Sequence, residues 1–140
     1  MFKKFFNKSR KKTFNRENIL VAALLVHSAK IDENYTKVEK TLITKALINL
    51  NSISQEEAEK LLIEAEEKEG QSNQIVEFTR EIKKKPMEFR LKIIEILWKI
   101  VYSDGTSDNF ESNLIRRICG LLYVSDKDSG MIKLKLKTKQ

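Results

Sequence analysis

The sequence contains few residues that break or constrain a backbone. It has four glycines and one proline in 140 residues, so the residues that typically form the tight turns of sheet proteins are rare. Leu, Ile, Lys and Glu are abundant instead, and these residue types favour helices. The length suits one domain. The composition therefore predicts an all-α fold in which helices are joined by short turns.

Cysteine and histidine each occur once, as Cys119 and His27. A single cysteine cannot form an internal disulfide, which indicates a reducing compartment and hence the cytoplasm. One cysteine and one histidine are also too few for a closed zinc site. Since both lie among apolar residues, we expect a buried, inert thiol and a packed or half-exposed histidine that binds no metal.

Several function classes lack the features that they require. No apolar run approaches the ~20 residues of a transmembrane helix, and the first residues lack the apolar centre of a secretory signal. The chain shows no phosphate-binding loop and no paired nucleophile and base. We therefore expect a protein that is not an enzyme.

The positive charge is confined to the two ends of the chain. Residues 1–16 carry seven cations and no acid, and residues 131–140 carry four lysines and no acid. Because the whole chain has a net charge of +7, residues 17–130 carry −4. The expected organisation is an acidic helical domain at 15–132 between basic tails at 1–14 and 133–140.

The N-terminal tail combines its cations with Phe2, Phe5 and Phe6 at helical spacing. This pattern suits weak contact of residues 1–16 with an anionic membrane surface, which would place the protein at the periphery of the inner membrane. A flexible tail that raises solubility fits the same residues equally well. Nucleic acid is a weaker candidate, because the domain itself is acidic.

Hydrophobic periodicity and capping signals predict about seven helices. Ser54 with Glu57, and Ser125 with Asp128, have the spacing of capping boxes. Pro86 should end one helix and serve as the first position of the next, which is apolar on most sides and should be central. The expected helices cover 15–30, 38–50, 54–70, 72–84, 86–101, 108–122, and a short segment from 125 that frays into the tail.

The chain carries one helix–loop–helix pattern twice. An offset of 72 residues aligns Asp32 with Asp104 and Glu39 with Glu111, and it aligns Leu42–Ile43 with Leu114–Ile115. Each copy is an apolar run, a polar loop that begins with Asp, and a second run near a Glu. The duplication predicts two pseudo-symmetric helix–loop–helix halves with equivalent acidic loops.

The acidic loops have the residue types that calcium or magnesium prefers. Asp104, Asp108 and Glu111 can converge where one helix ends and the next begins, and Gly105 permits a tight turn. The spacing is not that of an EF-hand. In the first copy Asp32, Glu33, the Thr36 hydroxyl and Glu39 form a weaker set. Aspartate before a helix and Glu three residues later are also helix-capping residues, so capped turns explain the same pattern.

The stretch Leu-Trp-Lys-Ile-Val-Tyr-Ser-Asp-Gly-Thr-Ser-Asp-Asn-Phe-Glu, followed by Leu-Ile-Arg-Arg-Ile-Cys-Gly-Leu-Leu-Tyr-Val-Ser-Asp, resembles the tellurite-resistance TerB family. The resemblance covers roughly residues 15–132. The stretch Glu77-Phe78-Thr79-Arg80 and the ending Asp128-Ser129-Gly130 look like those of the short, stand-alone bacterial members. It implies an all-helical fold of two pseudo-symmetric halves, an acidic surface, divalent-cation binding and a link to tellurite and other stress responses. The first copy departs from the family pattern, because Glu33 replaces the loop glycine and Thr36 replaces the second acid.

Two functions follow as expectations. The first is a non-enzymatic stress-response module that binds a divalent cation at the acidic loop of Asp104 and acts through an unidentified protein partner. The alternative is a metal-free interaction or co-chaperone-like adaptor whose acidic loops are only capped turns.

Overall fold

The structure is a computed structural model, and it describes residues 14–31, 35–72, 74–103 and 109–138. All its secondary structure in these ranges is helical, which confirms the predicted all-α class. Seven α-helices and one 3₁₀-helix are found there. They are α2 (Arg16–Ala29), α3 (Lys37–Asn51), α4 (Gln55–Gln71), α5 (Ile75–Thr79), η1 (Ile82–Lys84), α6 (Met87–Tyr102), α7 (Asn109–Leu122) and α8 (Asp126–Thr138).

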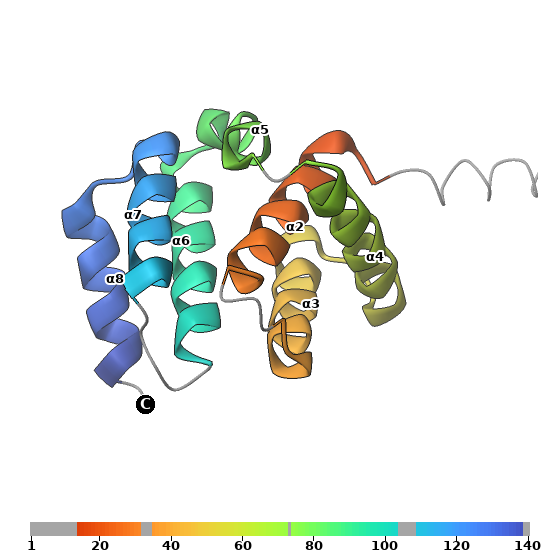
Figure 1. Ribbon diagram of the computed structural model, residues 1–140, viewed down its shortest axis with the longest axis horizontal. Coiled ribbons are helices and arrows are strands. Elements are labelled where there is room, and N and C mark those ends of the chain that lie inside the picture. Colours follow the sequence, from red (N-terminus) through yellow and green to blue (C-terminus); the bar gives the residue numbers. More distant parts are fainter. Residues whose placement is uncertain (1–13, 32–34, 73, 104–108, 139–140) are drawn as a thin grey trace, which may run out of the picture.

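The helices form two three-helix units, which we call the first unit (α2, α3 and α4) and the second unit (α6, α7 and α8). The short α5 lies above and between them, with α4 and α8 at opposite ends of the molecule (Figure 1). Within the first unit α2 packs on α3 and α4, and within the second α6 packs on α7 and α8. The predicted symmetry between the halves remains a prediction.

The core runs through the middle of the molecule, where the units meet. The central helices are α2 and α6, and α6 packs on both α2 and α3. Nine of the 14 residues of α2 are buried, from Leu20 to Ala29. In α6 the buried set includes Ile93, Leu97 and Trp98, which confirms the predicted central helix. None of the described helices has both the length and the apolarity that crossing a bilayer requires.

Local capping signals place most helix starts. Ser54 Oγ accepts a hydrogen bond from Glu57 N at 3.1 Å, while Glu57 Oε1 accepts one from Ser54 N at 2.9 Å, so the predicted capping box is present. Asn15 caps α2 through its side chain. Ser125 Oγ accepts from Asp128 N at 3.1 Å at the start of α8. These bonds satisfy backbone N–H groups that have no partner inside the helix.

The prediction of one helix over residues 72–84 is wrong. Two short pieces, α5 and η1, replace it. Thr79 Oγ1 donates to the carbonyl oxygens of Ile75 and Val76, and this kind of local bond competes with helix propagation. Pro86 favours an extended conformation for the residue before it, and Lys85 is extended, so η1 ends at Lys84.

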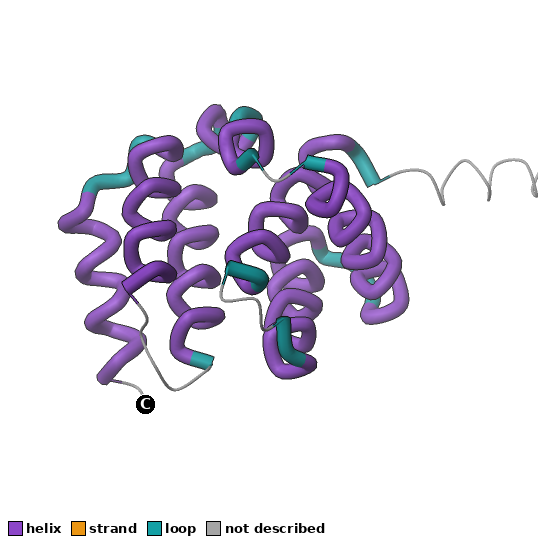
Figure 2. Tube along the Cα trace, in the orientation of Figure 1, coloured by secondary structure: helices purple, strands orange, loops and turns teal. Residues whose placement is uncertain are grey.

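Two other helix limits differ from the sequence-based expectation. Pro86 is the residue before α6 rather than its first position, because its ψ of 153° is extended, and its carbonyl accepts from Phe89 N and Arg90 N. The last helix is longer than predicted and continues to Thr138. Ile132 and Leu136, one turn apart, pack partly against the core, which holds this stretch in helix. Figure 2 shows that the described connections between helices are short.

Candidate functional site

The predicted cation loops lie mostly outside the described residues. This holds for Asp32, Asp104 and Asp108, and for the side chain of Glu111. The helices that flank the second loop are described: α6 ends at Tyr102 and α7 begins at Asn109. These two helices pack together, and their ends lie on the same lower side of Figure 1 as the start of α3. The described ends of α6 and α7 thus lie on one side of the molecule.

Glu39 is the one predicted ligand whose side chain is described. It is 2% exposed and takes part in a capping box at the start of α3. Its Oε1 accepts from Thr36 N at 2.8 Å and from Thr36 Oγ1 at 3.2 Å, while Glu39 N donates to Thr36 Oγ1 at 3.1 Å. Thr36 and Glu39 thus cap the start of α3, as the alternative interpretation of the acidic loops predicts.

A buried carboxylate from α4 contacts the end of α2. Glu69, which is 7% exposed, places Oε2 3.1 Å from His27 Nδ1 and Oε1 2.7 Å from Lys30 Nζ. Burial raises the pKa of Glu69, but the hydrogen bonds from Lys30 and His27 outweigh it and leave the pKa below its ordinary value. Glu69 is therefore ionised and paired. His27 also lies beside Phe78, with ring centroids 6.0 Å apart, which confirms a packed histidine.

A second glutamate of α4 holds the residues that lead into α3. Tyr35 Oη donates to Glu66 Oε2 at 2.8 Å, and Lys40 Nζ lies 3.9 Å from the same oxygen and 4.9 Å from the centre of the Tyr35 ring. Burial, the bond to Glu66 and the nearby charges of Glu66, Glu39 and Glu69 all raise the pKa of Tyr35. Tyr35 is therefore a neutral hydrogen-bond donor at neutral pH.

These contacts form what we call the α4 brace: Glu66 and Glu69 with His27, Lys30, Tyr35 and Lys40. Its carboxylates hold both sides of the first loop in place. Its acids have cationic or hydroxyl partners, which suits structural support better than catalysis. Among the described residues no group of three or more His, Cys, Asp or Glu side chains is arranged to hold a metal ion.

The sequence analysis did not identify the brace. A signal for Glu69 was present, because the buried stripe of α4 runs Ala58, Leu61, Leu62, Ala65 and then Glu69. An acid that continues an apolar helix face needs a buried partner. The identity of that partner, 42 residues away in sequence, could not be read from the pattern. Cys119 agrees with the prediction of an inert thiol, since it is 1% exposed and burial raises its pKa.

The fold and the caps define an all-helical protein with two three-helix units and an acidic-loop sequence between the first two helices of each. The sequence profile of the tellurite resistance protein TerB family matches residues 18–134, so the chain belongs to that family. No curated protein and no solved structure matches the chain. Family membership supports a domain associated with tellurite resistance.

Proposed function

We propose that this protein is a non-enzymatic, cytoplasmic tellurite-resistance-associated module that binds one divalent cation at Asp104, Asp108 and Glu111 and acts through a protein partner. The observation that supports it best is the difference between the two loops. In the first, Glu39 is buried in a capping box and the flanking helices are held by the α4 brace. The carboxylates needed for a cation are therefore better supplied by the second loop, which has Asp where the first has Thr36.

The chemistry of the second loop suits calcium or magnesium. Two aspartates and a glutamate offer hard oxygen ligands, and their charge offsets the cost of removing water from the ion. Asp108 directly precedes α7 in sequence and Glu111 is its third residue, so the two acids fall within one turn of each other. The cation would link the end of α6 to the start of α7 and present an ordered loop to a partner.

The metal-free adaptor is the second candidate, and the Thr36–Glu39 capping box favours it. Asp108 and Glu111 occupy the positions that align with Thr36 and Glu39, and these four residues have the types found in capping boxes. On this hypothesis Asp108→Ala costs about 1 kcal/mol of stability with or without a cation. Thr36→Ala should cost a similar amount.

Calorimetric titration of metal-stripped protein with calcium, and then with magnesium, tests the proposal. We expect saturable binding by the wild type, and loss of that binding in Asp104→Asn/Asp108→Asn. Asp126→Asn, which removes an acid from the first turn of α8, is the matched control and should bind as the wild type does. Absence of heat from the wild type at millimolar ion would contradict cation binding and leave the adaptor.

A further inference from the structure

A groove between α3 and α6 joins an apolar floor to a basic rim. It has a volume of about 220 Å³ and lies where the two units meet. Its floor is formed by Leu42, Ala46 and Leu50 from α3, at intervals of four residues, with Ile96 from α6. A surface of this shape suits the apolar ridge of another helix.

The rim of the groove is predominantly positive. It carries Lys45, Lys92 and Lys99 against one acid, Glu95. Glu95 forms an ion pair with Lys99 at 3.5 Å, and both side chains are about half exposed. Lys45 and Lys92 are exposed, and no ion pair is found for either among the described residues. A helix that binds in this groove should therefore carry acidic residues on both sides of an apolar residue.

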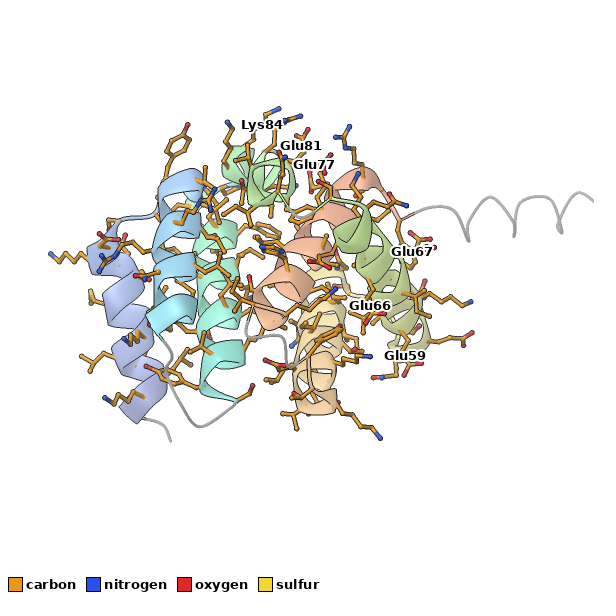
Figure 3. The ribbon with its side chains drawn as sticks, in the orientation of Figure 1. Glu59, Glu66, Glu67, Glu77, Glu81 and Lys84 are labelled. Atoms are coloured by element: carbon orange, nitrogen blue, oxygen red, sulfur yellow. The ribbon has the colours of Figure 1, made fainter. Side chains whose placement is uncertain are left out.

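The outer face of α4 has the complementary pattern. Ile63 is 60% exposed, and it lies on a helix with seven glutamates. Glu59 and Glu67 lie one turn before and one turn after Ile63, on the same side of the helix, and both are exposed. Figure 3 shows Glu59 and Glu67 along α4, at the end of the molecule opposite α8.

The spacing of the charges on the two surfaces agrees. Lys92 and Lys99 are seven residues apart on either side of Ile96, which corresponds to about 10 Å along a helix. Glu59 and Glu67 are eight residues apart around Ile63, or about 12 Å. A helix laid along the groove can therefore place each glutamate beside a lysine while Ile63 meets the floor.

We propose that the α3–α6 groove receives the acidic face of α4 from a second copy of this chain. Residues 1–13 of the same chain are a poorer occupant, because they carry six cations and no acid and would repel the lysines of the rim. The groove and α4 are different surfaces, so the contact is heterologous: each copy offers one groove and one helix, and association continues head to tail. Salt weakens it by screening the rim charges.

Sedimentation equilibrium of the full chain tests this contact. We expect the average mass to rise between about 10 µM and 1 mM protein at low salt, and to fall towards the monomer in about 0.5 M NaCl. Lys92→Glu impairs the groove and Glu59→Lys/Glu67→Lys impairs the helix, so each variant alone should associate about tenfold more weakly. Lys127→Glu, a reversal at an exposed lysine of α8, is the control and should associate as the wild type does.

Mixing the two impaired variants distinguishes this contact from others. The Lys92→Glu protein keeps a normal α4 and the Glu59→Lys/Glu67→Lys protein keeps a normal groove, so the two should pair. The altered groove and the altered helix also carry opposite charges, so the mixture should associate more strongly than either variant alone. Circular dichroism establishes that each variant is folded. A wild type that stays monomeric at 1 mM in low salt would overturn the proposal, and so would a mixture that fails to pair or variants that associate like the wild type.

Discussion

The third helices of the two units, α4 and α8, differ in charge and in the way each contacts the first helix of its unit. The segment that forms α4 has seven glutamates and two lysines, a net charge of −5, whereas that of α8 has four lysines and two aspartates, a net charge of +2. Glu69 of α4 forms an ion pair with Lys30, the residue after α2, and lies 3.1 Å from His27 Nδ1 in α2. In the second unit a neutral bond links the corresponding helices, from Trp98 Nε1 in α6 to Ser129 Oγ in α8 at 3.1 Å.

The two units therefore differ in the buried polar contact between their first and third helices. The loop pattern and the apolar positions after it still align, but the buried polar contact is ionic in one unit and neutral in the other. An ionic contact depends on the protonation of its members, whereas the bond of an indole N–H to a hydroxyl does not. The two units should therefore respond differently to mutation and to acid.

The largest expected effect follows from breaking the ionic contact. Glu69→Ala leaves His27 and Lys30 without their shared carboxylate, and we expect a loss of about 2–3 kcal/mol in the free energy of unfolding. This loss of stability should be smaller than the loss from breaking a fully buried ion pair, because Lys30 is 43% exposed. Urea unfolding measures it, with the exposed neighbour Glu67→Ala as a control that should change by less than about 0.5 kcal/mol. Equal effects from the two substitutions would contradict a supporting role for Glu69.

The neutral contact of the second unit should contribute less. Ser129→Ala removes the acceptor of Trp98 Nε1–H, and we expect a loss of about 1–2 kcal/mol because a buried donor is left without its partner. A double-mutant cycle with Trp98→Phe isolates the bond from the packing of the ring. Additive losses from the two substitutions would show that this bond adds nothing to stability.

The smallest expected effect is a difference in acid sensitivity. Since the pKa of Glu69 is lowered in the folded state, its contribution is present above the unfolded-state value of about 4.3 and is lost as the pH falls through the folded-state pKa. The stability of the wild type should therefore fall more steeply on acidification than that of Glu69→Gln. Hydrogen exchange below pH 5 should show amides of α2 losing protection before those of α6. Simultaneous loss in both helices would contradict the comparison.

The sequence by itself determined the features that rest on contacts within one helical turn. The all-α class, the starts of α2, α4 and α8, and the central place of α6 follow from capping residues and from the periodicity of apolar side chains. Ser54 and Glu57 find each other because they are three residues apart, whatever the rest of the chain does. The charge distribution and the likeness to the TerB family are likewise properties of the sequence.

Tertiary structure alone decided the contacts between residues far apart in the chain. Glu69 reaches His27 across 42 residues, and Trp98 reaches Ser129 across 31, because helix packing brings their faces together. The same packing extends α8, because Ile132 and Leu136 pack partly against the core. Local propensity is too weak to fix such outcomes, since the free energy that selects them comes from burial between helices.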